Sequence, residues 1–330
     1  MSRLYLQQIG DRLQDQIREG LEFINWREII FPDSIVFIKP NLTWPEIRPG
    51  VTTSKEFVEA LLAVVCERTT HVHIGESNGG TFPAEAAFTA HGLPEICHRY
   101  NAELINLSKK PVVTVTDTIA GRSISIEASR FLIHDVDVFI TLPVLKTHVV
   151  TRVSLGLKNQ WGCIPSPMRL LYHHILDWGI AALNKAYRPQ ISILDGTYAL
   201  DRHGPLKGDA IPTGWMALSD NVVALDAFGC HLLGVEASSV RHILFSAMAG
   251  MGTLDLDEIE LNQPLPLSFI KSRIEPDIFD LISIYLYRSR LLSKLAFDSP
   301  FTKIIYKIIN RTPPGMINTT LQQDAHTSSH

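Results

Sequence analysis

One short segment in the middle of the chain concentrates side chains that can hold an anion and move a proton. Lys146, Thr147 and His148 are consecutive, and Lys158 and Asn159 follow in a glycine-containing stretch. The two ammonium groups could neutralise a carboxylate or a phosphate, and a lysine desolvated in a cleft could also act as a base. His148 suits proton transfer or metal ligation, because an imidazole titrates near neutral pH. This segment therefore predicts anion binding with acid–base chemistry.

Two earlier segments carry further groups of this kind. Lys39 and Asn41 flank a proline that ends an apolar run, and the stretch Gly75-Glu-Ser-Asn-Gly-Gly80 supplies Glu76, Ser77 and Asn78. The glycines of that stretch, Gly75 included, would let backbone N–H groups approach a phosphate or carboxylate. The spacing of the nucleotide P-loop and the dinucleotide GxGxxG pattern are both absent. A literal GxSxG match makes a nucleophilic serine a minor alternative, because no helix follows it directly.

Two more places complete the candidate set. Asp195 follows an apolar run at 190–194, where a carboxylate could take part in acid–base work. His173 and His174 precede Asp177, and adjacent histidines on a helix diverge by about 100°, so both cannot bind one small ion. His173 and Asp177 are spaced to pair on a helix. A divalent metal here stays an open alternative, although the HExxH spacing is absent.

Apolar patterns place these groups at the ends of predicted strands. Strong strand patterns cover 34–38, 137–142 and 190–194, and a short one covers 71–74. Weaker ones cover 104–107, 112–115, 123–126 and 215–218. Helical patterns cover 10–23, 54–68, 84–90, 222–233 and 238–248. The alternation predicts an α/β fold with a mostly parallel sheet and helices on both faces. Ligands of such sheets bind beyond the carboxyl ends of the strands, so the four polar segments should converge there.

Three regions are predicted along the chain. Residues 1–33 form a helical lead-in, 34–250 the α/β core domain, and 251–330 a C-terminal helical extension with a disordered tail. Basic and apolar residues mix between 276 and 310, where packing against the main domain is favoured over contact with a membrane surface. Asp226 lies inside an apolar helical pattern and needs a partner, for which a lysine is the candidate.

The composition excludes several classes of protein. Hydrophobic residues make up 45% of the 330 residues and charged residues 19%, which is typical of a globular chain and not of a disordered one. The net charge of −4 gives no sign of nucleic-acid binding. The four scattered cysteines form no iron–sulfur or zinc motif. No signal peptide or long apolar run is evident, so a cytoplasmic location is predicted.

A series of short motifs resembles the domain of unknown function 362 family over about two-thirds of the chain. The motifs are Ile38–Leu42, Thr52-Thr53, Gly75–Ser77, Leu142–His148, Gly156–Asn159 with Gly162, His173, Leu194–Gly196 and Ala224–Asp226. The resemblance adds Thr52 and Thr53 to the candidate ligand-binding residues. Many members carry a ferredoxin-like cysteine cluster that this chain lacks, and the lysine–histidine and glycine-rich segments are distantly similar to anion-binding segments of the lactate racemase family.

These observations predict an enzyme that binds a small anionic molecule at the edge of the sheet. Lys39, Lys146 and Lys158 would neutralise the anion, while asparagines and the Gly75 backbone orient it. His148 or His173 would move a proton, and Asp195 or Glu76 would complete the set of acid and base groups. Isomerisation, elimination and hydrolysis are reactions of this kind. Two alternatives stay open: an accessory protein for a redox or metal centre with an iron–sulfur partner, and a non-catalytic binding module.

Overall fold

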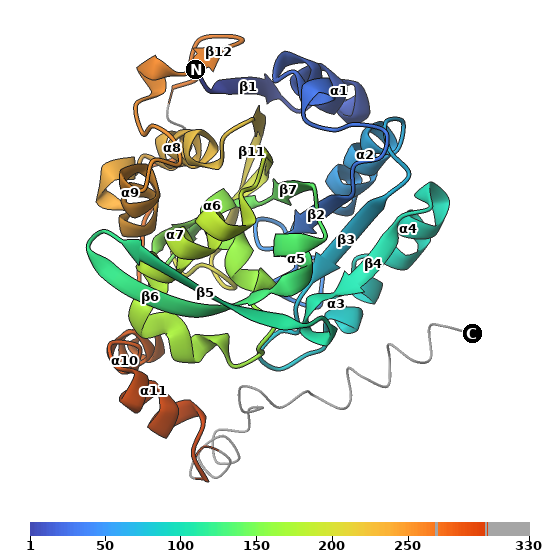
Figure 1. Ribbon diagram of the computed structural model, residues 1–330. Helices are drawn as coiled ribbons and strands as arrows, with labels where there is room; N and C mark the ends of the chain where they lie inside the picture. Colours follow the sequence, from blue (N-terminus) through green and yellow to red (C-terminus); the bar gives the residue numbers. More distant parts are fainter. Residues whose placement is uncertain (268–269, 301, 303–330) are drawn as a thin grey trace.

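The computed structural model describes residues 1–267, 270–300 and 302 (Figure 1). Among these residues, ten strands form one sheet and two more form a separate antiparallel pair. The strands are β1 (Arg3–Gln8), β2 (Val36–Pro40), β3 (Val72–Glu76), β4 (Glu103–Asn106), β5 (Val112–Ile119), β6 (Arg122–Ser129), β7 (Val138–Leu142), β8 (Val144–His148), β9 (Arg152–Ser154), β10 (Ile191–Asp201), β11 (Asp209–Ser219) and β12 (Glu260–Leu261). The α-helices are α1 (Leu13–Phe23), α2 (Lys55–Val65), α3 (Ala84–Ala90), α4 (Leu93–Tyr100), α5 (Arg130–His134), α6 (Gly156–Asn159), α7 (Leu176–Tyr187), α8 (Val222–Leu233), α9 (Arg241–Met248), α10 (Ile278–Leu286) and α11 (Arg290–Phe297).

The large sheet is mostly parallel, as predicted. Its order is β12-β1-β11-β10-β7-β2-β3-β4, and the run from β10 to β4 is parallel throughout. Strand β11 is antiparallel to both β10 and β1. Strand β8 follows β7 after a single proline and also pairs with β10, so the two strands occupy one side of β10 in succession. The carboxyl ends of β2, β3 and β7 therefore lie at one edge.

Helices cover both faces of this sheet because its central strands are buried on both sides. Every residue of β2 is buried, and successive side chains point to opposite faces. Val36 and Ile38 pack in the core that also holds the apolar faces of α1, α2 and α4. Phe37 packs in the other core, with α7 and α8. Figure 1 shows these two helical layers on either side of the sheet. The predicted fold class is confirmed.

The predicted helical lead-in also contributes a strand. Residues Arg3–Gln8 form β1, which pairs with β11 over five residues and places Leu4 and Leu6 in the core. Only α1 and a short 3₁₀ turn at Trp26–Glu28 are helical in this region. The strand is six residues long and follows the first two residues of the chain, so its pattern is too short to distinguish from the helical periodicity that follows it.

Two strands extend further than the sequence pattern indicates. Asp195 was expected to follow a strand, but β10 continues to Asp201 because β11 pairs along it, with an irregularity after Gly196. Lys146, Thr147 and His148 were expected to follow the strand predicted at 137–142, and they form part of a further strand, β8. A proline removes only one hydrogen-bond donor, so a new strand can begin directly after it.

The C-terminal region contains two helices, α10 and α11, which project from one side of the molecule (Figure 1). Between residues 251 and 275 the chain forms only a 3₁₀ turn at Leu256–Glu258 and the short strand β12. The tail predicted as disordered lies outside the described residues. Among the helices that the structure describes, none is both long and apolar enough to cross a membrane.

Candidate functional site

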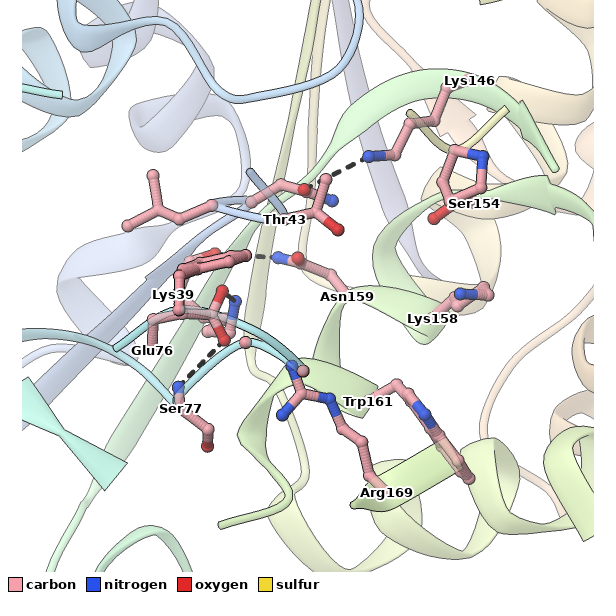
Figure 2. A pocket seen from close by; sticks show the side chains of 17 residues that line it. Lys39, Thr43, Glu76, Ser77, Lys146, Ser154, Lys158, Asn159, Trp161 and Arg169 are labelled. Atoms are coloured by element: carbon pink, nitrogen blue, oxygen red, sulfur yellow. Dashed lines mark hydrogen bonds and ion pairs between the residues drawn. The ribbon is translucent and has the colours of Figure 1, made fainter. Parts of the chain in front are cut away.

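A cavity of about 180 Å³ lies beyond the carboxyl ends of β2 and β3 (Figure 2). It brings together side chains from β2, β3, β8, α6 and the 3₁₀ segment Arg169–Ile175. Strand ends, a helix start and loops converge here, as the topology requires. Seven of the residues predicted for the site line this cavity: Lys39, Asn41, Glu76, Ser77, Lys146, Lys158 and Asn159.

A buried ion pair forms one wall of the cavity. Lys39 Nζ lies 2.5 Å from Glu76 Oε2, and the two side chains are 1% and 6% exposed. The same ammonium donates to the carbonyl oxygen of Pro40, and Glu76 Oε1 accepts the backbone N–H of Ser77. Gly162 lies against the pair, and a Cβ there would be 2.7 Å from Glu76 Oε1. A larger side chain at this position would displace the end of the Glu76 side chain, so glycine lets the pair keep this geometry.

Lys146 reaches the cavity from β8, buried at 1% exposure. Its ammonium donates to the carbonyl oxygen of Val51 at 2.7 Å and to Asn41 Oδ1 at 3.2 Å. Asn41 is itself held by Thr53, whose Oγ1 accepts the Asn41 N–H and donates to Leu142. Burial, followed by the charges of Lys158 and Lys39, holds the pKa of Lys146 well below its usual range. No carboxylate among the described residues lies within 4 Å of this ammonium.

The short helix α6 carries the next two cavity residues and is anchored by Asp226. The Asp226 carboxylate accepts the N–H groups of Gly156 at 2.7 Å and Leu157 at 3.0 Å. The predicted lysine partner is therefore wrong, because the orphan N–H groups of the helix start satisfy this carboxylate. Burial raises the pKa of Asp226 to about 8. Asn159, on α6, donates to the carbonyl oxygen of Lys39 and to Thr141 Oγ1.

Lys158 is the cation with the fewest contacts in the cavity. It is half-buried, and no residue in the described ranges forms a hydrogen bond or ion pair with its ammonium. Burial and the charge of Arg169 lower the pKa of Lys158 to about 8, against an opposing effect of Asp177. Its ammonium is thus poised to exchange a proton near neutral pH.

Arg169 also lines the cavity, although its type and spacing did not single it out in the sequence. Its Nη1 donates to the carbonyl oxygen of Asn78 at 2.7 Å. In Figure 2 its guanidinium extends toward the Lys39–Glu76 pair. Burial lowers the pKa of Arg169, opposed by the nearby charge of Glu76. The only available signal was a basic residue four positions before His173.

The two predicted proton-transferring histidines lie outside the cavity lining. His148 is buried, and its Nδ1 accepts the N–H of Val150 and of Thr151, so the neutral ring carries its proton on Nε2. Burial holds the pKa of His148 well below its usual range. His173 Nδ1–H donates to the carbonyl oxygen of Leu170, and its ring stacks on Tyr287, with ring centroids 4.3 Å apart.

The predicted pairing of His173 with Asp177 is wrong. Asp177 Oδ2 lies 3.6 Å from Arg241 Nε, and its Oδ1 lies 3.7 Å from His242 Nδ1. His173 lies in the 3₁₀ segment before α7, whereas Asp177 is in the first turn of α7. The two residues therefore do not share one helical face, which the i, i+4 spacing assumed.

Asp195 and the threonines have structural partners away from this cavity. Asp195 accepts hydrogen bonds from Ser54 and Thr197 and lies with Thr52 at a second, mainly apolar cavity of about 500 Å³. Thr147 Oγ1 donates to the carbonyl oxygen of Leu200. Thr53 does not line the cavity, but its Oγ1 accepts the N–H of Asn41, which does.

Gly75 and Asn78 support the cavity without lining it. Gly75 lies inside β3, where a Cβ would be 2.7 Å from both the Ile105 carbonyl oxygen and the Phe37 ring. Gly79, Gly80 and Gly162 line the cavity instead. Asn78 Oδ1 accepts from Ala84 N–H and its carbonyl holds Arg169. Gly75 is therefore a packing residue, and Asn78 is a positioning residue.

In the described part of the chain, no three His, Cys, Asp or Glu side chains are grouped so that they could hold a metal ion. The four cysteines are free thiols, and three of them are buried. A divalent metal for this chain stays a prediction.

Comparison with known proteins shows three similarities. The chain is 28% identical over 249 residues to the Thylakoid-associated protein sll1697 of Synechocystis sp., which covers 72% of this chain and 73% of that protein. A crystal structure of a Thermotoga maritima protein matches with a TM-score of 0.38 and 15% identity, over 60% of this chain. The match spans about half (53%) of that protein's length. The sequence profile of the family described as Domain of unknown function (DUF362) matches residues 36–231, which hold every residue of the cavity. The chain therefore belongs to the DUF362 family.

Proposed function

We propose that this protein binds a small anionic molecule, a carboxylate or a phosphate, in the cavity and transfers a proton to or from it. The observation that carries the proposal is the excess of positive charge. Lys39 is neutralised by Glu76, but Lys146, Lys158 and Arg169 line the same cavity with no ion-pair partner among the described residues. Like charges that are partly buried together repel, so an anion bound between them would be favoured.

Within this proposal, Lys158 is the group that moves the proton. It lines the cavity, it has no hydrogen-bond partner in the described ranges, and its pKa lies near 8. Lys146 and Arg169 are better held, by Val51 and Asn78, and would fix the anion. Proton transfer to or from a positioned anion is the step that isomerisation, elimination and hydrolysis share. His148 and His173, the earlier candidates, do not line the cavity.

Replacing Lys146 by methionine tests the binding site. Methionine is unbranched and only one atom shorter than lysine, and the change removes one buried amino group. The affinity for a bound anion should therefore fall about 10- to 100-fold, the effect of losing one charge-assisted hydrogen bond. The melting temperature without ligand should stay within about 5 °C of the wild type, because methionine fills most of the space that the lysine side chain occupied. Isothermal titration with acetate, malonate and phosphate measures the affinities.

Lys55→Gln is the matched control, because Lys55 is exposed at the start of α2 and does not line the cavity. It should bind each anion as the wild type does. A folded Lys146→Met protein with unchanged affinity for every anion would contradict the proposed site.

A second candidate function, association with a membrane surface, is favoured by the exposed apolar face of α10 and α11. Seven large apolar side chains on these helices are at least half exposed: Ile278, Phe279, Leu281, Ile282, Tyr285, Leu291 and Leu295. Arg288, Arg290 and Lys294 lie beside them. Exposed apolar side chains next to basic ones are typical of helices that lie in a lipid interface. The similar Synechocystis protein is named as thylakoid-associated.

The double variant Ile278→Ser, Ile282→Ser tests this second function in the full chain. The two side chains are 64% and 50% exposed, so the fold should tolerate the change while the apolar face loses two contacts. Co-sedimentation with phosphatidylglycerol vesicles should fall at least about tenfold, because each buried apolar side chain contributes about 1.5–3 kcal/mol. Met248→Ser, at a 64% exposed position elsewhere, should sediment as the wild type. Wild-type protein that stays in the supernatant would rule out this function.

A further inference from the structure

We infer that the anion of this cavity carries a phosphoryl group, with two negative charges on one compact group. The inference rests on the proposed anion-binding function and names its ligand class. Three observations support it: the number of unmatched cations, two buried donors without partners, and the small volume of the cavity.

The first observation is the count of charges around the cavity. Among the described lining residues there are four cations, Lys39, Lys146, Lys158 and Arg169, and one carboxylate, Glu76. The carboxylate is engaged by Lys39 at 2.5 Å and by the Ser77 N–H. Three basic side chains are left without a carboxylate partner, and a bound anion would favour their charged forms. A monocarboxylate would neutralise one of them, whereas a phosphoryl dianion would neutralise two and is the usual partner of such lysine and arginine sets.

The second observation is that two hydrogen-bonding groups of the lining residues are unused. Ser77 Oγ and Trp161 Nε1 are buried, and neither has a hydrogen-bond partner among the described residues. Buried donors without partners are rare in folded proteins, because each one costs about 1–3 kcal/mol. A phosphoryl group has three terminal oxygens with several lone pairs, so it can accept from these donors in addition to the three cations.

The third observation is the size and composition of the cavity. Its volume is about 180 Å³, which is small for a site with four cationic side chains. Gly79, Gly80 and Gly162 contribute backbone without side chains to its wall. A phosphoryl group carries its charges on oxygens around a single atom, so several cations can contact it at once, whereas a dicarboxylate separates its charges along a chain. The compact dianion fits this arrangement better.

The test compares anions of different charge and shape by isothermal titration at pH 7 and constant ionic strength. The probes are inorganic phosphate, methyl phosphate, pyrophosphate, malonate and acetate. At least one phosphoryl probe should bind about tenfold or more tightly than malonate and acetate. Tighter binding of methyl phosphate than of inorganic phosphate would assign the site to phosphate esters, and the reverse order would assign it to free phosphate; both outcomes support the inference.

Variants of Arg169 connect the binding to this cavity. Arg169→Gln should weaken phosphoryl binding about 10- to 100-fold, and Arg169→Lys, which keeps the charge and loses the two-pronged donor geometry, should give a smaller loss. Lys55→Gln should change nothing. Phosphate binding that both Arg169 variants leave intact would overturn the inference, because the phosphate would then sit elsewhere. Malonate or acetate binding as tightly as phosphate overturns the inference and leaves the proposed function standing, whereas no binding of any anion overturns both.

Discussion

Replacing Lys39 by methionine should lower the free energy of unfolding by about 3 kcal/mol, the largest stability effect expected of any single change at the cavity. The substitution removes the ammonium that lies 2.5 Å from Glu76 and leaves a carboxylate with 6% exposure. A buried charge that loses its partner keeps its full cost of desolvation. The charge of Arg169 still acts on Glu76, so the effect belongs at the low end of the range for broken buried pairs. Urea unfolding at pH 7 measures the change.

The matched controls are Glu76→Gln and the double variant Lys39→Met, Glu76→Gln. Glutamine keeps an oxygen that can accept the Ser77 N–H but carries no charge. The double variant has no unpaired buried charge, so it should be more stable than Lys39→Met alone. If the free-energy changes of the two single variants simply add in the double variant, the contact between the two side chains does not carry the stability assigned to it.

Binding of sulfate should weaken about tenfold between pH 7 and pH 9, because Lys158 must be protonated to hold an anion. With a pKa of about 8, Lys158 is about nine-tenths charged at pH 7 and about one-tenth charged at pH 9. The sign follows from linkage: an anion favours the charged form, so binding takes up a proton and weakens as the pH rises through the pKa of the free protein. Sulfate is the suitable probe because its charge is constant over this range. Titration calorimetry at pH 7, 8 and 9 gives the affinities.

Lys158→Arg isolates the group responsible for this pH dependence. A guanidinium stays charged across the whole range, so the variant should bind sulfate with nearly the same affinity at pH 7 and pH 9. A variant that retains the tenfold loss would assign the titration to another group. Lys146 would then be the candidate, because its pKa is also lowered by burial.

Most of the strands and helices of the fold could be predicted from continuous apolar patterns in the sequence. The strand predicted at 137–142 corresponds to β7 (Val138–Leu142), and the helix predicted at 222–233 is α8 in full. Helix α8 has a clear local signal at both ends: Asn221 accepts the N–H groups of Val223 and Ala224, and Gly234 follows with φ at +64°. Burial on both sides of the sheet produces such unbroken runs, so the sequence itself contains this information.

The strand-end argument explains which site residues were found and which were not. Lys39 and Glu76 lie at the carboxyl ends of the neighbouring strands β2 and β3, so the topology of the sheet brings them together. The same reasoning gave a wrong position for Asp195. Strand β10 continues beyond the end of its apolar run, because it pairs there with β11. Arg169 could not be found, because its place depends on a hydrogen bond to the Asn78 carbonyl that no local pattern encodes. Short-range patterns predict elements, whereas contacts between distant loops depend on the completed fold.

The cavity is assembled from side chains that lie far apart along the chain, from Lys39 on β2 to Arg169 before α7. These groups become neighbours only in the folded sheet, so an anion bound between them would contact distant segments of the chain at once. Such a ligand would bind the folded domain and not the unfolded chain. At a concentration one hundred times its dissociation constant, a ligand there would add about 2.7 kcal/mol to the stability of the whole domain. A metabolite bound in this cavity would thus also slow the proteolysis of the protein.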